Sequence, residues 1–571
     1  MGDVFVKTTV RRRGDKAYTY LSLVESVRVD GKMTHNTLLR LGEVGELRRT
    51  RQLDRIIAAL RTHAEGSWVD GDELSAAGAP GFGAMAAVKT YFDRLGLFSF
   101  FAGLGDRRNA EHLEDALYVM TANRLVRPWS KRRTVLEWLD DVALPTGVDV
   151  PSLAQCYRGL DAMAVAKAAL EPHLYDRLTD LTNLDLRLCC YDLTSTYFET
   201  DKKESPAFPS RRFGYSRDKR GDRPQVVIGL LVTGDGIPIA HHVFAGNTAD
   251  VTTLPMVMAD YEKRFCTGRI ALVADRGLIS EENVAEVQAA GFDHVLATRL
   301  HDSAEVTAAL EAARRPDALW VPVKDANSAA CDVAVGEKRY VVVTSLPRFV
   351  RDNARRSELL SRCEDKLVAL EDRVRAGRLT DPAKIGAAAD RILRDSGVGR
   401  CFTTYIRRGS FSWDHDQEAL HYEEDLLAGR YVLSTSLGNE QASTESVVRY
   451  YRALQRVERR FRVLKDFIGL RPIYHWKERR VRGHIAVCML AATIEAVMGK
   501  DLATAGVMDP DLDGQVLSAR RALAELNRIR RVSLDAGDHS VTVVTRRNAL
   551  QSKILAAFGM DTSDWDRATI A

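Results

Sequence analysis

Two aspartates each close a short apolar run of the kind that forms buried strands. Asp192 ends LDLRLCCYD, and Asp275 ends RIALVAD. If these strands are neighbours in one sheet, both carboxylates emerge at the same edge, where ligands gather. Two ionised carboxylates side by side repel each other, and a divalent cation that prefers oxygen ligands, such as Mg2+, relieves that repulsion. The pair therefore predicts a metal site, although each aspartate alone is more simply interpreted as a helix cap or turn residue.

A third carboxylate lies on a basic helix, YYRALQRVERRFRVLKDF (450–467). Apolar side chains recur here at helical spacing and predict a buried stripe made of Val447, Tyr450, Leu454, Val457, Phe461 and Leu464. Tyr451, Glu458 and Lys465 follow at seven-residue spacing beside this stripe. A carboxylate at the edge of a core needs an ion-pair partner or a metal. Arg462, four residues further on, is the alternative partner for Glu458.

Positive charge is concentrated around this helix. The whole sequence has a net charge of only +4, but the segment 449–482 holds twelve Lys or Arg against three acids. Such a density favours a polyanionic partner. Because a solvated helix face shows the same kind of run, charge alone favours nucleic acid only slightly.

Membrane and disulfide-rich classes are disfavoured. No apolar segment follows the early basic residues, and the longest apolar run, 485–498, is too short to span a bilayer and contains Glu495. We therefore expect a cytoplasmic protein without a membrane partner. The eight cysteines form no Cys-x-x-Cys pair, so neither a zinc site nor a disulfide framework is indicated.

The elements that would position the two aspartates alternate between strands and helices. Three strands come first, in LDLRLCCYD, PQVVIGLLVT and IPIAHHVF, and the last two are joined by a GDG turn. A helix near 252–265, the strand RIALVAD, a helix at 281–290 and the strand FDHVLATR follow. The order β-β-β-α-β-α-β predicts an α/β fold with a mixed sheet.

The chain is long enough for several domains. Residues 4–42 alternate in the manner of strands, with turns at 13–15 and 30–32, and the Gly/Ala/Pro stretch at 76–85 has the composition of a linker. A break in the α/β rhythm predicts a mainly β insertion subdomain. The predicted divisions are 1–75 (β-module and helix), 86–180 (helical, DNA-binding), 183–301 (first part of the core), 302–440 (insertion subdomain), 441–500 (second part of the core, with the Glu458 helix) and 501–571 (C-terminal region).

Together these motifs resemble the DDE transposases of bacterial insertion sequences, in the insertion sequence 4 group and its insertion sequence 1634 branch. The family motifs are matched by YDLTSTYFE, VADRGLIS and a helix carrying Tyr451, Glu458 and Lys465 in a Tyr-x2-Arg-x3-Glu-x6-Lys pattern. The stretches GYSRDKRGDRPQVVIGLL, GIPIAHHVFAGNTAD and RPIYHWKERRVRGHI are also similar, and the resemblance covers nearly the whole chain. Leu454 stands where the pattern has Arg.

The resemblance implies an RNase-H-like catalytic core in which Asp192, Asp275 and Glu458 are catalytic and hold two Mg2+ ions, with Mn2+ as a substitute. It also implies that Tyr451 and Lys465 bind DNA phosphate. Because Leu454 cannot hold a phosphate, Arg452 or Arg456 is expected to supply that contact from a neighbouring position. The remaining residues of the predicted DNA-binding set are Arg452, Arg456, Arg459 and Arg462.

The implied function is that of a transposase. It would bind the terminal inverted repeats of its own insertion sequence, cleave DNA by metal-dependent phosphoryl transfer and join the ends to target DNA. A homodimer would bring two ends together at the bacterial nucleoid. Two alternatives are a catalytically impaired, transposase-derived DNA-binding protein and a hydrolase that uses Asp192 and Asp275 as an acid–base pair. Nearby arginines are expected to lower the pKa of both aspartates, which disfavours a general acid.

Overall fold

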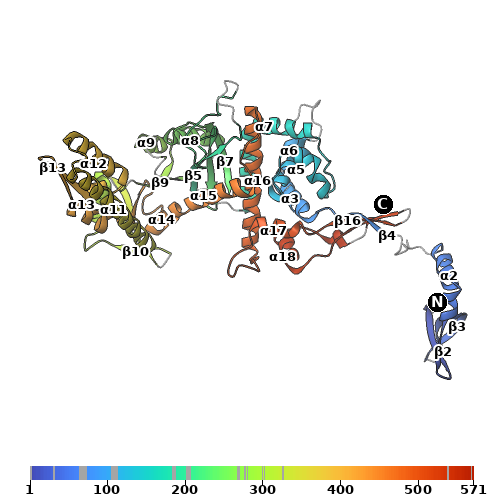
Figure 1. Ribbon diagram of the computed structural model, residues 1–571. Coiled ribbons are helices and arrows are strands. Elements are labelled where there is room, and N and C mark those ends of the chain that lie inside the picture. Colours follow the sequence, from blue (N-terminus) through green and yellow to red (C-terminus); the bar gives the residue numbers. More distant parts are fainter. Residues whose placement is uncertain are drawn as a thin grey trace. The chain divides into compact units, whose positions relative to one another are not determined.

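The structure is a computed structural model (Figure 1). It describes residues 3–29, 32–63, 74–103, 113–182, 188–200, 208–265, 270–275, 278, 281–298, 300, 303–324, 327–536, 539–566 and 569–570. The chain divides into two compact units. The first comprises Met1–Gly78, Val532–Val543 and Arg567–Ala571, and the second comprises Ala79–Arg531 and Val544–Asp566.

A three-stranded antiparallel sheet begins the first unit. Its strands and the helices that follow them are β1 (Val4–Arg13), β2 (Lys16–Val29), β3 (Lys32–Glu43), α1 (Val44–Arg49) and α2 (Gln52–Arg61). The predicted turn at 13–15 is confirmed, and Gly14 there adopts a φ of +62°, which glycine accommodates without strain. The second predicted turn, at 30–32, has its first two residues outside the described residues.

The predicted linker at 76–85 contains the boundary between the two units, which falls between Gly78 and Ala79, but its first residues belong to a strand and its last to a helix. Strand β4 (Leu74–Gly78) pairs with β16 (Arg531–Ala536), in a sheet that also contains β17 (His539–Val544) and β18 (Thr569–Ile570). Helix α3 (Gly83–Arg94) begins five residues after β4 ends. The small side chains of this stretch form a strand because a segment far along the chain supplies the hydrogen-bond partners.

Helices fill the stretch before the large sheet. They are α3, α4 (Leu97–Ala102), α5 (Leu113–Val126), α6 (Lys131–Leu136) and α7 (Leu153–Thr182). The long helix α16 (Glu478–Thr504) packs against α7 and α5 (Figure 1). Among the described helices, α16 is long and apolar enough to cross a bilayer, but 94% of its most apolar window is buried inside the protein. It therefore packs as a core helix.

A nine-stranded mixed sheet forms the centre of the second unit. Its strand order is β10-β11-β12-β15-β9-β8-β5-β6-β7. The predicted order β-β-β-α-β-α-β is confirmed by β5 (Leu188–Tyr197), β6 (Gln225–Thr233), β7 (Pro238–Ala245), α8 (Thr253–Arg264), β8 (Ala271–Ala274), α9 (Glu281–Ala289) and β9 (Asp293–Ala297). Strands β5, β8 and β9 run parallel, whereas β6 and β7 are antiparallel to their neighbours.

The two faces of this sheet pack into different cores. On β5, Cys189, Tyr191 and Leu193 contribute to the core beneath α8 and α9. The intervening Cys190 contributes to a second core, which also contains residues of α14 (Thr444–Arg452), α15 (Leu454–Arg462) and α16. Because side chains alternate along a strand, Asp192 lies on the same face as Cys190, toward α15.

Asp192 does not end its strand, as the sequence had suggested. Strand β5 continues to Tyr197, because residues 193–197 keep pairing with β6 after the pairing with β8 has stopped at Tyr191. Asp192 therefore lies where β5 loses its parallel neighbour but keeps its antiparallel one.

The stretch 302–440 is not mainly β. Four of its strands extend the central sheet: β10 (Trp320–Pro322), β11 (Ser328–Val335), β12 (Lys338–Ser345) and β15 (Arg430–Thr435). The rest is largely helical and has a core of its own, built from α11 (Leu346–Arg375), α12 (Pro382–Ser396) and the hairpin of β13 (Phe402–Arg407) and β14 (Ser410–His415). These four elements lie together in Figure 1. The strands of this stretch therefore divide between the core sheet and the separate β13–β14 hairpin.

Candidate active site

Asp192 and Asp275 occupy neighbouring positions on two parallel strands. Tyr191 of β5 is opposite Ala274, the last residue of β8. Asp192 follows Tyr191 in the chain, and Asp275 follows Ala274. Neighbouring strands lie about 4.8 Å apart. Because Tyr191 points into the core beneath α8 and α9, Asp192 faces the other side, toward α15. Asp275 follows the last residue of β8, is exposed, and acts electrostatically on Asp192.

Helix α15 brings the third carboxylate to this face. Leu454, Val457 and Phe461 are buried in the core that α15 shares with the sheet, and the helix packs directly on β5. Glu458, next to Val457, is exposed. The predicted buried stripe is confirmed, except that Tyr450 is only partly buried. Leu454 is 8% exposed, so it serves packing and is not available to a phosphate.

The three carboxylates influence one another. The pKa of Asp192 is raised to about 6, chiefly by burial and also by the charges of Asp275 and Glu458, while the N–H of Leu193 (2.7 Å to Oδ1) and the charge of Arg217 oppose the rise. The expectation that arginines would lower this pKa is wrong. Arg217 is the arginine that acts on Asp192, and its effect is smaller than that of burial.

This donor set fits a divalent cation. A buried carboxylate whose charged form is disfavoured by two others is the arrangement that Mg2+ relieves with oxygen ligands. Among the described residues, however, no three His, Cys, Asp or Glu side chains are close enough together to hold one ion. Asp275 and Glu458 thus lie within electrostatic range of Asp192 rather than at coordinating distance.

Glu458 does not form the ion pair with Arg462 that the sequence offered as an alternative. In the described part of the chain, the ion pairs of α15 join Arg456 to Asp235 (3.8 Å) and Arg460 to Glu495, and none joins Glu458 to Arg462. Among the described residues, the charge of Glu458 is thus not neutralised by Arg462, and it acts on Asp192.

The residues predicted to bind DNA differ in their surroundings. Arg456, Arg459 and Arg462 are exposed. Tyr451 and Arg452 are half-buried, and the ring of Tyr451 lies against that of Tyr431, with 5.6 Å between ring centroids.

Lys465 has a partner that the sequence did not indicate. Its Nζ lies 2.7 Å from Oδ1 of Asp218, and the same oxygen accepts a hydrogen bond from Arg471 at 2.5 Å. Asp218 and Arg471 belong to the stretches GYSRDKRGDRPQ and RPIYHW. These stretches resemble the family, but nothing in their spacing connects them with Lys465, which is 247 residues from Asp218.

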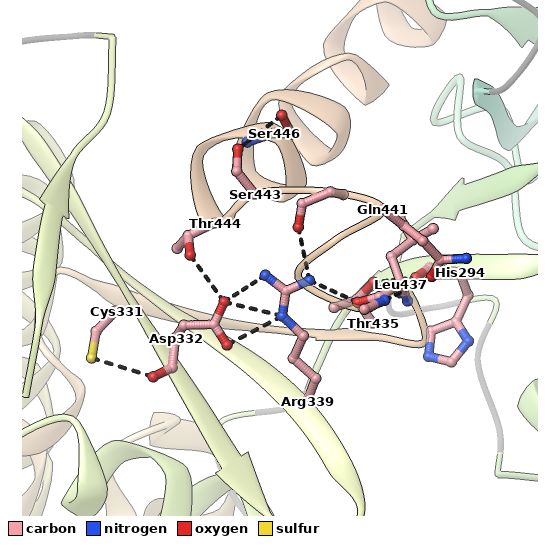
Figure 2. Close-up of polar contacts among 12 residues, drawn as sticks. His294, Cys331, Asp332, Arg339, Thr435, Leu437, Gln441, Ser443, Thr444 and Ser446 are labelled. Atoms are coloured by element: carbon pink, nitrogen blue, oxygen red, sulfur yellow. Dashed lines mark hydrogen bonds and ion pairs between the residues drawn. The ribbon is translucent and has the colours of Figure 1, made fainter.

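A buried arginine fixes the segment that leads into α14 and α15 (Figure 2). Arg339 of β12 donates from Nε (3.0 and 3.1 Å) and from a terminal nitrogen (2.5 Å) to the carboxylate of Asp332. Its other terminal nitrogen donates to the carbonyls of Leu437 (2.7 Å) and Ala442 (2.9 Å). Thr444, the first residue of α14, donates to Asp332 at 2.9 Å. One guanidinium thus ties β11 and β12 to the loop from which the Glu458 helices start.

Replacing Arg339 with lysine is expected to destabilise the protein by about 2–3 kcal/mol, because an ammonium cannot make the forked contact and the two carbonyls lose their donor. The loss is measurable as a lower urea midpoint. Lys338→Ala is the control, since Lys338 is the adjacent, exposed cation and pairs with exposed Glu305. Equal stability of the two variants would contradict the anchoring role.

Two family models match the chain. A family model for the IS1634 family transposase N-terminal domain matches residues 6–72, and a model for the transposase DDE domain matches residues 186–494. Among solved structures, the chain is similar to a piggyBac transposase in a synaptic complex with hairpin DNA, with 10% sequence identity, a TM-score of 0.33, and coverage of 78% of this chain and 79% of that chain. No curated protein matches the chain. The DDE model covers more than half of the sequence and contains all three carboxylates, and with the N-terminal match it establishes that the chain belongs to the DDE transposases of the IS1634 family.

Proposed function

We propose that this transposase binds the terminal inverted repeats of its own insertion sequence, cleaves the DNA beside them by metal-dependent phosphoryl transfer and joins the ends to target DNA. The observation that carries the proposal is that Asp275 and Glu458 lie within electrostatic range of Asp192, and that the Glu458 helix carries exposed arginines. In this proposal, β5 to β9 form an RNase-H-like core, and two copies of the chain hold the two ends of the element.

Each of these residues has a defined task in the proposed reaction. Asp192, Asp275 and Glu458 would hold two Mg2+ ions, which when bound activate the attacking hydroxyl and neutralise charge on the leaving oxygen. The N–H of Leu193 keeps one oxygen of Asp192 fixed. The exposed guanidiniums of Arg459 and Arg462 contact backbone phosphates and hold the strand across the carboxylates. Phosphoryl transfer of this kind uses water or a 3′-hydroxyl as nucleophile, so no nucleophilic side chain is required.

The two alternatives are less well supported. A catalytically impaired DNA-binding descendant was suggested by Leu454, but Leu454 packs in the core, and all three carboxylates are present and within electrostatic range. A hydrolase with two acidic residues leaves the third carboxylate and the exposed arginines without a role.

The proposal is tested with the purified full-length protein and duplex DNA from the regions that flank its reading frame. With Mg2+, we expect strand cleavage at the borders of a pair of inverted repeats. A chelator should stop cleavage without preventing binding, and Mg2+ or Mn2+ should restore it. Duplexes with scrambled repeats are the control. Binding without cleavage under any metal would favour the DNA-binding alternative, and absence of specific binding would reject both.

A further inference from the structure

Asp218 lies in a turn that is held in place at several points. The N–H of Arg217 donates to Oγ of Ser195 on β5 (3.1 Å), and the Arg217 guanidinium pairs with Asp250 at 2.6 Å. Oγ of Ser216 accepts the N–H of Arg220 at 3.1 Å. At the next residue, Lys219, the backbone adopts a φ of +58°, a left-handed conformation that costs a non-glycine residue about 1 kcal/mol. Such strain persists only where surrounding contacts impose it, and it is common at functional sites.

Two cations from separate segments meet at this aspartate. Lys465 lies in the π-helical turn Val463–Phe467, two helical turns beyond Glu458. Arg471 lies in the next segment, which is fixed to the end of β5 by the N–H of Ile473 donating to the carbonyl of Tyr197 (3.0 Å). The Asp218 side chain is 4% exposed, and those of Lys465 and Arg471 are 11% and 29% exposed. Without the carboxylate of Asp218 between them, the side chains of Lys465 and Arg471 would repel each other.

The contacts of this cluster leave hydrogen-bonding capacity unused. Both cations share Oδ1 of Asp218, while its buried Oδ2 has no hydrogen-bond partner among the described residues. An ammonium has three donors and a guanidinium five. The contacts that involve them here are those of Lys465 with Asp218 and of Arg471 with Asp218 and Asp466 (3.3 Å). Donors therefore remain on both cations.

The cluster is electrostatically connected with the three carboxylates. Burial lowers the pKa of Lys465, and the charges of Arg471 and Arg217 add to this effect, whereas Asp218 opposes it. The same Arg217 acts on Asp192.

Lys465 and Arg471 share one buried carboxylate, whereas Arg217 is already paired with Asp250 and Arg471 also lies near the exposed carboxylate of Asp466. Two cations that keep free donors beside an acidic site fit a phosphodiester oxygen as their ligand.

We propose that Arg471 joins Lys465, whose phosphate contact the family resemblance already implies, in a preorganised binding site for one DNA phosphate near the three carboxylates, and that Asp218 is the positioning residue that holds the two cations together. The inference rests on the proposed function and specifies how the site holds its substrate. It assigns the required guanidinium to Arg471 rather than to Arg452 or Arg456. Arg456 instead lies near Asp235 (3.8 Å).

Asp218→Asn tests the positioning role, because it keeps the size of the side chain and removes its charge. DNA binding is measured in a chelator, and cleavage is measured at saturating DNA with Mg2+. We expect affinity for the element's ends to stay within about threefold, since positive charge is not lost, while the cleavage rate constant falls about 10- to 100-fold because the scissile phosphate is held less accurately. Asp222→Asn, an exposed carboxylate of the same loop, is the control and should change neither quantity more than twofold.

Arg471→Ala tests the phosphate contact itself and covers the case in which Asp218→Asn lowers the Tm. Loss of one phosphate contact should weaken binding and reduce the slope of log affinity against log salt by about one. Unchanged cleavage in Asp218→Asn, or a loss of slope in Arg456→Ala but not in Arg471→Ala, would overturn the inference while leaving the proposed function intact. If the unmodified protein neither binds nor cleaves the ends, the proposed function itself fails.

Discussion

Asp192→Asn is expected to reduce metal-dependent strand cleavage by at least about 10³-fold while leaving binding to the element's ends within a few-fold. Asparagine has nearly the same shape but lacks the charge that would hold a divalent cation together with Asp275 and Glu458. The measurement is single-turnover cleavage of end DNA in Mg2+, with binding measured separately in a chelator.

The stability of this variant separates a catalytic role from a structural one. In the metal-free protein, burial and two neighbouring carboxylates raise the pKa of Asp192, so its ionised form is disfavoured by the fold. Removing that charge should therefore leave the Tm unchanged or raise it, even though activity is lost. A variant that loses activity only because it unfolds would show a lower Tm.

Two comparisons complete this experiment. Asp317→Asn changes an exposed aspartate far along the chain and should behave as the unmodified protein. Asp275→Asn and Glu458→Gln should each cause a loss similar to that of Asp192→Asn, and combining two of them should cost little more, because the three act as a unit. Cleavage that survives Asp192→Asn would remove this residue from the active site.

The sequence alone could single out Asp192, Asp275 and Glu458 as candidate site residues because each lies in a locally defined pattern. Asp192 and Asp275 follow apolar runs that form neighbouring strands, and Glu458 lies beside a stripe at helical spacing. Apolar residues at helical or strand spacing predict the element directly, because burial of the apolar face is what stabilises it.

Contacts between segments far apart in the sequence could not be predicted from local sequence patterns. Nothing local shows that β15 joins β9, that β4 pairs with a strand more than 450 residues later, or that Lys465 meets Asp218. The direction of the pKa shift of Asp192 was missed for a related reason. Of the arginines counted along the sequence, Arg456, Arg459 and Arg462 are exposed on α15. Burial, which depends on the whole fold, outweighs the effect of Arg217, the arginine that acts on Asp192.

Glu171→Gln is expected to lower the free energy of unfolding by about 3–5 kcal/mol, the usual cost of removing one partner from a buried ionic network. Glu171 of α7 is 7% exposed in its side chain. Its carboxylate accepts hydrogen bonds from the backbone N–H (3.0 Å) and Nδ1 (2.8 Å) of His241, and pairs with Lys167 (3.2 Å) and Arg264. His241 belongs to β7, an edge strand of the sheet, so the carboxylate also satisfies a backbone donor that has no strand beside it.

The pH dependence of unfolding identifies this carboxylate. Burial alone would raise the pKa of Glu171, but the hydrogen bond and charge of His241, with the charges of Lys167 and Arg264, outweigh it and lower the pKa to about 2 from an ordinary value of 4.5. The contribution of Glu171 to stability is therefore complete above pH 4.5 and is lost as the pH falls toward 2. Burial lowers the pKa of His241, so that protonation of this residue in the unfolded chain reduces stability already below pH 6.5.

Urea midpoints measured from pH 7 to 2 should converge for the unmodified protein and Glu171→Gln only in the lower part of this range. The control is Asp180→Asn, at an exposed position of the same helix, and its urea midpoints should follow those of the unmodified protein at every pH. A constant difference in midpoint between Glu171→Gln and the unmodified protein at every pH would show that Glu171 stabilises the fold by packing rather than by charge.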